Sequence, residues 1–341
     1  MLCTLYSSLF IFFRQYAIFA QTFDVIKKIL IIRFSSIGDI VLTTPVIRCL
    51  KQQAAAEIHY LVKPGFAHVI ETNPYIDRTI LLKDDFNDTI RDLKQEKYDL
   101  IVDLHKNLRS YRISIALPVK TVRFNKLNFK KWLLVRFKWN LLQKDKHLIN
   151  RYFDALKPFG IYDDGYGMDY PISPEDDNKA IEIAKGLPYQ VLVLGATYFT
   201  KRIPEEKCAE IINSYPDTTI LTGGSDVAEL ADRLTARYPG KILNTAGNVR
   251  LGVSAALIRH SQRVVTGDTG LMHIAAALQK EIIVIWGNTI PQFGMYPYYG
   301  HKSTQIHINK EVLNLQCRPC SKLGFDHCPK GHLKCMKEIE W

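Results

Sequence analysis

The sequence has no apolar run long enough to cross a membrane. Its most apolar stretch, residues 5–13, is interrupted by Arg14 well short of the roughly 20 residues that a spanning helix requires. The same stretch lacks the basic start of a secretory signal peptide. We expect residues 1–24 to be a disordered tail, an interfacial anchor, or an extension that precedes the true translation start near Phe23. The chain is therefore expected to be cytosolic, and at most peripheral to a membrane.

Two phosphate-related motifs are also missing. The loop after the first apolar strand, residues 35–38, has no G-x-G-x-x-G fingerprint, which argues against a dinucleotide-dependent oxidoreductase. The chain has no Asp-x-Asp pair that would hold Mg²⁺ against a diphosphate. A phosphate-binding site in this chain would therefore have to draw on lysines, hydroxyls and backbone N–H groups.

Acidic residues are scarce relative to basic ones, with 34 Asp and Glu against 45 Lys and Arg, a net charge of +11. The excess is concentrated in residues 120–151, where only Asp145 is acidic and five Phe and Trp residues are interspersed. The cations there are Lys120, Arg123, Lys126, Lys130, Lys131, Arg136, Lys138, Lys144, Lys146 and Arg151. This composition suits an anionic membrane face, a phosphorylated lipid or nucleic acid. A solvated helix face whose aromatic residues belong to the core would look the same.

Length and strand spacing indicate two α/β domains. A chain of 341 residues exceeds the usual size of a single core. Short strand-like runs alternate with amphipathic stretches, which predicts βαβ units and parallel sheets. The predicted strands are Lys28–Phe34, Ile58–Val62, Leu100–Leu104, Val191–Leu194, Thr218–Thr222, Arg263–Thr266 and Ile282–Trp286. Gly, Pro, Asp and Tyr accumulate in residues 160–174, so we predict a first domain over 25–167 and a second over 168–341.

Residues 263–277 predict a strand, a Gly-Asp-Thr-Gly turn and the start of a helix. Thr269 suits the N-cap of that helix, while Gly267 and Gly270 suit the tight turn. A helix N-terminus presents unpaired N–H groups and a positive dipole end, which favour a pyrophosphate. Asp268 is a candidate acceptor for a ribose or sugar hydroxyl. An ordinary αβ unit with well-chosen turn residues would show the same short pattern.

A second junction of this kind follows the first strand. Residues 35–39, Ser-Ser-Ile-Gly-Asp, lie between the strand and a helix-like run. Asp39 would lie at the carboxyl end of a parallel strand, where it is a candidate general base. The alternative is an ordinary acidic residue in the first turn of a helix. Pro45 should bend or end the first turns of that helix.

These motifs together resemble glycosyltransferase family 9, the lipopolysaccharide heptosyltransferases. The resemblance runs from about Lys27 to about Ile339 and is carried by Ser36-Ile-Gly-Asp39 with Pro45, by Gly267-Asp-Thr-Gly-Leu-Met-His273, and by the phosphate-loop-like segment Leu194–Pro204. It implies a GT-B fold, in which two Rossmann-like domains with parallel sheets face a central cleft. It also implies that an ADP-heptose donor binds the second domain and a lipid-anchored lipopolysaccharide inner-core acceptor binds the first.

Carried onto this sequence, the resemblance implies inverting, metal-independent transfer. Asp39 is expected to be the base and Lys201 to neutralise the leaving diphosphate. The donor-binding residues are expected to be Thr197, Lys201, Glu229, Asp268, Thr269, Gly270, Leu271 and His273. The acceptor-binding residues are expected to be Ser36, Gly38, His105, Arg109, Lys130, Lys131 and Arg136. The acceptor also implies docking at the inner leaflet of the cytoplasmic membrane.

The four C-terminal cysteines form a separate candidate site. Cys317 and Cys320 make a C-x-x-C pair, and Cys328 and Cys335 follow within twenty residues. Disulfides do not persist in a reducing cytosol, and this spacing resembles that of zinc sites. We expect either a structural zinc or merely clustered, reduced thiols. Four thiolates leave no open coordination position, so no catalytic cofactor is expected.

Two other functions are kept as alternatives. The same fold could transfer a different nucleotide-activated sugar to a surface glycan, because motifs do not record the shape of a sugar pocket. A more remote alternative is a non-catalytic nucleic-acid-binding protein that uses the basic segment, which would show a steep salt dependence and no response to ADP.

Overall fold

The computed structural model describes residues 26–341, so the expectations for residues 1–24 lie outside the described part. The described chain divides into two compact units. Unit 1 contains residues 26–35, 43–125 and 149–164, and unit 2 contains residues 36–42, 126–148 and 165–341. The chain therefore passes into unit 2 for a short stretch directly after its first strand. Among residues 26–341, no helix has the length and apolar character that crossing a bilayer requires.

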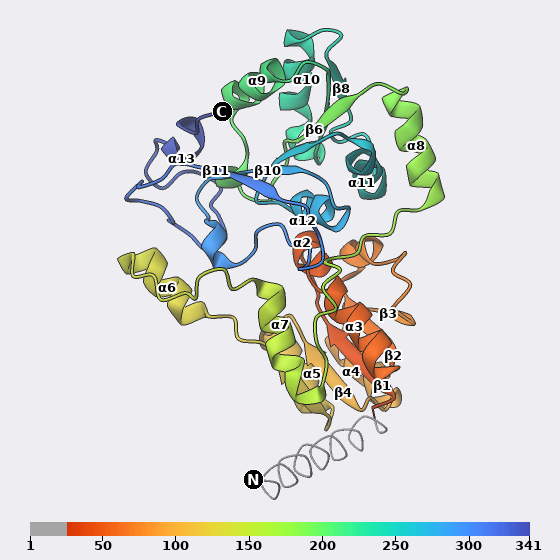
Figure 1. Cartoon of the computed structure of the whole chain (residues 1–341). Coiled ribbons are helices and arrows are strands. Elements are labelled where there is room, and N and C mark those ends of the chain that lie inside the picture. The colour runs from red at the N-terminus through yellow and green to blue at the C-terminus, as the bar shows by residue number, and fades with distance from the viewer. Residues whose placement is uncertain (1–25) are drawn as a thin grey trace, which may run out of the picture. The chain divides into compact units, whose positions relative to one another are not determined.

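Unit 1 is a five-stranded parallel sheet with helices packed on it (Figure 1). The strand order is β3-β2-β1-β4-β5. The strands are β1 (Lys28–Ile32), β2 (Glu57–Val62), β3 (Arg78–Leu81), β4 (Leu100–Asp103) and β5 (Lys120–Arg123). The helices are α3 (Thr44–Ala54), η1 (Pro64–Val69), α4 (Phe86–Gln95), α5 (Leu108–Ala116), α7 (Leu148–Leu156) and η2 (Lys157–Phe159). Leucine and isoleucine side chains of β1, β4, α4 and α5 form one continuous buried cluster, which fixes these helices on the sheet.

Unit 2 is a six-stranded parallel sheet in the order β11-β10-β9-β6-β7-β8. Its strands are β6 (Tyr189–Val193), β7 (Thr218–Thr222), β8 (Ile242–Asn244), β9 (Val264–Gly267), β10 (Ile282–Trp286) and β11 (His307–Glu311). Its helices are α2 (Ile37–Val41), α6 (Asn128–Phe137), α8 (Pro174–Ala184), η3 (Phe199–Lys201), α9 (Glu205–Ser214), η4 (Ser225–Val227), α10 (Ala228–Arg237), α11 (Leu251–His260), α12 (Gly270–Ala277), η5 (Pro291–Phe293) and α13 (Lys334–Lys337). In Figure 1, α9 and α10 lie on one side of this sheet, and α8, α11 and α12 lie on the other.

The direction of winding reverses between β6 and β9 in unit 2. β7 and β8 lie on one side of β6, and β9, β10 and β11 lie on the other. The loops after β6 and β9 therefore diverge at the carboxyl edge of the sheet. Open parallel sheets bind their ligands at such a reversal point.

The strands predicted from apolar runs are confirmed. The strands that the sequence did not predict, β3, β5, β8 and β11, are the edge strands of the two sheets. β3 is mostly exposed, β11 is partly exposed, and both mix charged with apolar residues, so they carry no continuous apolar signal. The predicted break at Pro45 is also confirmed. α2 ends at Val41, and α3 begins at Thr44 with Pro45 in its first turn, where the missing N–H needs no partner.

Two glycines let α2 pack closely on α12 within unit 2. A Cβ atom on Gly38 would lie 2.5 Å from Cδ2 of His273, and one on Gly270 would lie 2.9 Å from the Ile37 side chain. Real side chains do not approach this closely, so both positions require glycine for steric reasons. The contact keeps residues 36–42 in unit 2.

We predict that Gly38→Ala lowers the free energy of unfolding by about 1–3 kcal/mol, because the added methyl group must displace the buried His273 ring. Denaturant unfolding of the full chain measures this effect. Gly65→Ala is the matched control, since a Cβ atom there has no neighbour within 4 Å. Equal effects of the two substitutions would contradict the proposed steric cause.

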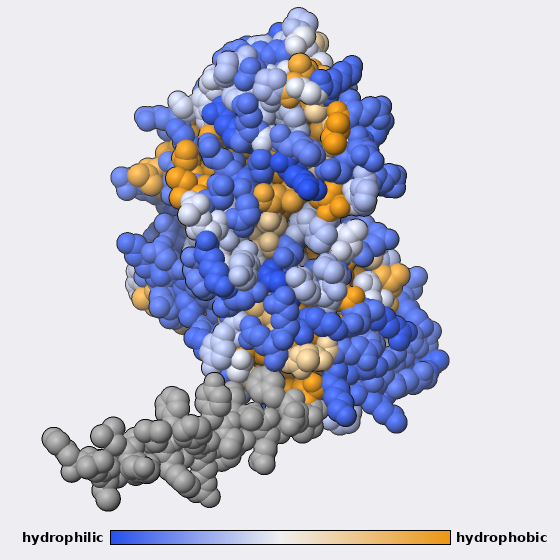
Figure 2. All heavy atoms as spheres, turned by 45° about the vertical axis from the view of Figure 1, so that its right-hand side comes forward, coloured by the Kyte–Doolittle hydropathy of each residue, from blue (hydrophilic) through white to orange (hydrophobic). Residues whose placement is uncertain are grey.

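The space-filling view shows a mainly hydrophilic face, on which apolar side chains form small separate areas (Figure 2). Isolated apolar side chains are normal on protein surfaces. A cluster of exposed aromatic side chains that contact one another is less common, and α6 has such a cluster.

Candidate functional site

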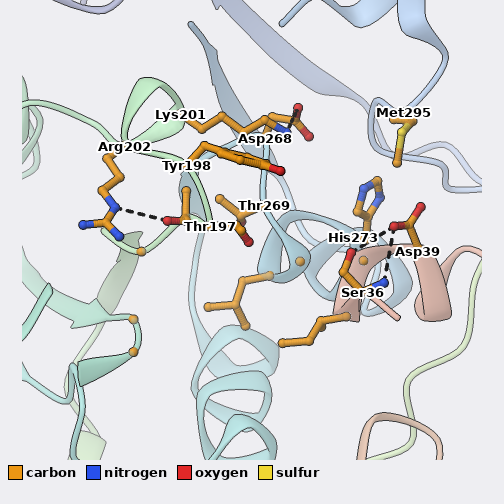
Figure 3. A pocket seen from close by; sticks show the side chains of 18 of the residues that line it. Ser36, Asp39, Thr197, Tyr198, Lys201, Arg202, Asp268, Thr269, His273 and Met295 are labelled. Atoms are coloured by element: carbon orange, nitrogen blue, oxygen red, sulfur yellow. Dashed lines mark hydrogen bonds and ion pairs between the residues drawn. The ribbon is translucent and has the colours of Figure 1, made fainter. Parts of the chain in front are cut away.

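A pocket of about 810 Å³ lies in unit 2, at the carboxyl edge of its sheet (Figure 3). Its walls come from the loops after β6, β7, β9 and β10, from α2, and from a C-terminal segment. Most of the predicted site residues of unit 2 line it, namely Ser36, Gly38, Asp39, Thr197, Lys201, Asp268, Thr269, Gly270, Leu271 and His273. Residues far apart in the sequence are thus brought to the reversal point of the sheet.

The N-terminus of α12 opens into this pocket. The Thr269 side chain accepts a hydrogen bond from the backbone N–H of Met272 at 3.3 Å, which confirms its predicted N-cap role. The first N–H groups of a helix have no partner within the helix, and those of Gly270 and Leu271 belong to this turn. Together with the helix dipole, they favour an anion at this position.

Lys201 is held at the pocket by Asp268. Its Nζ lies 2.7 Å from Asp268 Oδ2, and both side chains are largely buried. The hydroxyl of Thr289 donates a second hydrogen bond to the same oxygen at 2.9 Å. The carboxylate therefore fixes the ammonium group of Lys201 in place. The sequence indicated Asp268 as an acceptor for a ligand hydroxyl and did not indicate this ion pair.

Asp39 lies in the first turn of α2 and also lines the pocket. Its Oδ2 accepts a hydrogen bond from the Ser36 hydroxyl at 2.9 Å and a weak one from the Ser36 N–H at 3.4 Å. Asp39 thus has the capping role that was the alternative interpretation of this residue. Capping and catalysis are compatible here, because the half-buried carboxylate is also part of the pocket wall.

His273 is buried beside Asp39 at the end of the pocket. Burial lowers the pKa of this imidazole to about 4, and the nearby carboxylates of Asp268 and Asp39 only partly oppose that effect. The ring is therefore neutral at neutral pH. Its Nδ1 is buried without a hydrogen-bond partner among the described residues. A neutral ring with one unused nitrogen can donate to or accept from a bound ligand, but it supplies no charge.

The far side of the pocket is formed by the loops after β6 and β7. Arg202 donates from Nε to the Ala196 carbonyl at 3.1 Å and forms an ion pair with Asp226 at 2.5 Å. Gly223 and Gly224 line this side without side chains, together with Val249. The sequence did not indicate Arg202 as a site residue, because its ion pair joins two separate loops.

Several predicted residues lie outside this pocket. Glu229 is in the first turn of α10, next to the loop that lines the pocket, and is not part of the lining. His105 and Arg109 belong to unit 1, in the loop and helix that follow β4. The His105 ring packs on Phe34 with the centroids 4.7 Å apart. Lys130, Lys131 and Arg136 are on α6.

The four C-terminal cysteines are all free thiols or thiolates. Burial raises the pKa of Cys335 to about 12 and also raises that of Cys320. Within residues 26–341, no group of three or more His, Cys, Asp or Glu side chains is arranged to hold a metal ion. These thiols do not fit a metal in this arrangement. Structural zinc stays a prediction from their spacing, and no catalytic step is derived from it.

Comparisons with known proteins agree with this geometry. A family model described as glycosyltransferase family 9 (heptosyltransferase) matches residues 87–324. The chain is 25% identical over 333 residues to lipopolysaccharide heptosyltransferase 1 of Pseudomonas aeruginosa, a match that covers 89% of this chain and 88% of that protein.

Solved structures show the same fold. A glycosyltransferase family 9 protein from Veillonella parvula has a TM-score of 0.69 at 22% identity and covers 83% of this chain and 86% of its own. An E. coli heptosyltransferase solved with ADP has a TM-score of 0.60 at 22% identity, with 83% and 93% covered. The predicted GT-B class, with two Rossmann-like domains built on parallel sheets, is confirmed by these neighbours and by the two sheets described above. Because the family match covers more than half of the chain, this protein belongs to glycosyltransferase family 9, the heptosyltransferases, and is a glycosyltransferase.

Proposed function

We propose that this enzyme transfers a heptose from ADP-heptose to a lipid-anchored lipopolysaccharide inner-core acceptor, with inversion and without a catalytic metal. The observation that carries the proposal is the pocket of unit 2, in which a carboxylate and an anion-binding helix N-terminus share one wall. The names of the relatives support the substrate class, since lipopolysaccharide heptosyltransferases match most of the chain. A related E. coli enzyme was solved with ADP, which supports ADP as the nucleotide part of the sugar donor.

In this proposal, the donor diphosphate binds at the N-terminus of α12. The N–H groups of Gly270 and Leu271, the hydroxyl of Thr197 and the ammonium group of Lys201 all belong to the lining of the same pocket. Charge-assisted contacts to phosphate are stronger than neutral hydrogen bonds, so Lys201 has the largest single effect. The nucleoside would extend toward Gly223, Gly224 and Val249, where two glycines leave the wall without side chains.

Asp39 is the proposed general base. Its carboxylate takes the proton from the acceptor hydroxyl as that oxygen attacks the anomeric carbon, while the bond from this carbon to the donor phosphate breaks on the opposite face. ADP carries away the bonding electrons, so no covalent sugar intermediate forms and the configuration inverts. The increased negative charge on the departing ADP is neutralised by Lys201 and the α12 N–H groups. These groups take the place that a divalent ion has in other transferases.

The outer face of α6 is the proposed membrane contact. Three aromatic side chains of α6, Phe129, Trp132 and Phe137, and Trp139 just beyond its end are 46–70% exposed. Each ring contacts the next along the chain, with the centroids 5.5–6.0 Å apart. Exposed Lys130 and Arg136 lie on the same helix. Tryptophan and cationic side chains prefer the headgroup region of an anionic bilayer. The inner face of α6 packs through Leu134 on Ile290 and Phe293, two residues that line the pocket. The same helix would therefore orient the pocket toward a lipid-borne acceptor.

We predict that Asp39→Asn lowers heptose transfer from ADP-heptose at least roughly 10²-fold, because the amide cannot accept the proton, while ADP affinity stays near that of the wild type. Mass-spectrometric turnover with a panel of ADP- and UDP-sugars measures the transfer, and calorimetry measures ADP binding. The control is Asp226→Asn, which changes a second pocket carboxylate that is already paired with Arg202 and should cause a much smaller loss. Undiminished turnover of Asp39→Asn would remove Asp39 as the base, and wild-type preference for UDP-sugars would overturn the ADP-heptose assignment.

We predict that Lys201→Ala weakens ADP binding roughly 10- to 100-fold, because a phosphate contact is lost and Asp268 is left as an unpaired charge in the pocket. The double variant Lys201→Ala with Asp268→Asn should recover part of the affinity, since it removes that repulsion. EDTA should not reproduce the loss in the wild-type enzyme. A strict requirement for added Mg²⁺ would contradict the metal-independent mechanism.

For the membrane contact, Trp132→Ser with Trp139→Ser should lower affinity for anionic vesicles at both low and high salt. Lys130→Gln with Arg136→Gln should lower it roughly tenfold, and mainly at low salt, because screening already weakens charge contacts at high salt. Lys138 is left intact, since it donates to the backbone carbonyls of Cys317 and Pro319. Ile306→Ser is the control, because this exposed apolar side chain lies outside α6. If both double variants bind vesicles as tightly as the control variant, the exposed side of α6 is only a solvated helix face.

A further inference from the structure

The C-terminal segment Cys317–Phe325 supplies part of the wall of the donor pocket. Lys322 and Leu323 line the pocket alongside the loops that hold Lys201 and Asp268. In the sequence, the four cysteines are the conspicuous feature of this region. Lys322 is the cation that this segment contributes to the pocket.

One end of the segment is joined directly to the phosphate-loop-like residues. The N–H of Thr200 donates to the Phe325 carbonyl at 3.1 Å, and the N–H of Phe325 donates to the Thr200 hydroxyl at 2.9 Å. Gly324 packs so closely on Tyr198 that a side chain at this glycine would have no room. Thr200 is the residue before Lys201, so this end of the segment is anchored beside the cation that pairs with Asp268.

The other end is clamped by Arg318. Its guanidinium group donates to the carbonyls of Gly287 at 2.6 Å and Thr289 at 2.9 Å, and it pairs with Glu311 at 2.7 Å. The Arg318 side chain is only 6% exposed, so these contacts are shielded from water. Thr289 in turn donates to Asp268. Both ends of the segment are therefore fixed to the residues that hold Lys201.

Within the described chain, Lys322 differs from the other two cations of the pocket in having no carboxylate partner. Lys201 and Arg202 already have carboxylate partners, Asp268 and Asp226. The side chain of Lys322 has no hydrogen bond or ion pair to any residue that the structure describes. Counting Asp39, the lining has three carboxylates and three cations, so it brings no net positive charge to a diphosphate. Lys322 is then the pocket-lining cation in the described chain that no carboxylate already neutralises.

We propose that Lys322 binds the diphosphate of the nucleotide-sugar donor, as a second cation beside Lys201. The inference rests on the proposed function, because it needs a donor with a diphosphate in this pocket. The segment Cys317–Phe325 is then a part of the donor site that the fold holds in place.

The test is ADP binding to the full-length chain by calorimetry. Lys322→Ala should bind ADP roughly 5- to 30-fold more weakly than the wild type, and the difference should shrink as salt is added. Lys322→Arg should stay near the wild type, since it keeps the charge. Adenosine should bind all three equally, because it has no phosphate. Lys330→Ala is the matched control, as this exposed lysine of the same C-terminal region does not line the pocket.

Each other outcome overturns the inference in a recognisable way. Equal ADP binding by wild type and Lys322→Ala means that Lys322 does not contact the diphosphate, and the proposed function stands. A raised KM for the acceptor with unchanged ADP affinity assigns Lys322 to an acceptor phosphate instead. An equal loss for adenosine and ADP means that the substitution has disturbed the pocket wall. If the wild type binds no ADP at all, the proposed function fails together with the inference.

Discussion

The close contact between α2 and α12 is the constraint on which the candidate site depends. Gly38 and Gly270 have no side chains at the point where these helices meet, so the His273 ring and Ile37 fill the space. This packing places Asp39 in the same compact unit as the turn at Thr269, the proposed phosphate site. The strand that precedes Asp39 belongs to the other unit, so the chain must cross between units immediately before its candidate base. The proposed base and the proposed phosphate site therefore belong to one compact unit.

Electrostatics within the pocket centre on Asp268. Its carboxylate orients Lys201 and accepts a hydrogen bond from Thr289, whose own carbonyl accepts one from Arg318. A lysine fixed in this way needs little rearrangement to meet a phosphate, which is the condition for efficient stabilisation of a leaving group. His273 forms part of the pocket wall, and its ring is neutral because burial lowers its pKa to about 4. Charge for the diphosphate therefore has to come from lysines and backbone N–H groups.

Local features of the sequence predicted local features of the fold. The apolar runs around Ile31 and Val265 predicted buried strands, Thr269 predicted an N-cap, and Pro45 predicted a break between two helices, because each of these follows from the preferences of a few adjacent residues. The assignment of α2 to unit 2 could not be predicted in this way. It depends on a contact between residues more than two hundred positions apart.

Contacts between residues distant in the sequence also explain why the sequence did not indicate some of the site residues. Arg318 and Lys322 lie in a cysteine-rich segment whose composition drew attention to metal binding, and only the hydrogen bonds to Gly287, Thr289 and Thr200 show that it forms a pocket wall. Lys138 reads as one more surface cation, but it donates to backbone carbonyls beside the cysteines. Side chains whose partners are distant in sequence carry no local signal of their role.

Hydrogen–deuterium exchange with and without ADP tests the central claim, that the base and the phosphate site belong to one unit that responds to the donor together. ADP should slow amide exchange in peptides that cover residues 36–42, 197–202 and 268–274, because α2 packs on α12, the helix whose N-terminus is the proposed phosphate site. Slower exchange in the last two peptides with no change in residues 36–42 would show that α2 is not coupled to the phosphate site, and would contradict this account.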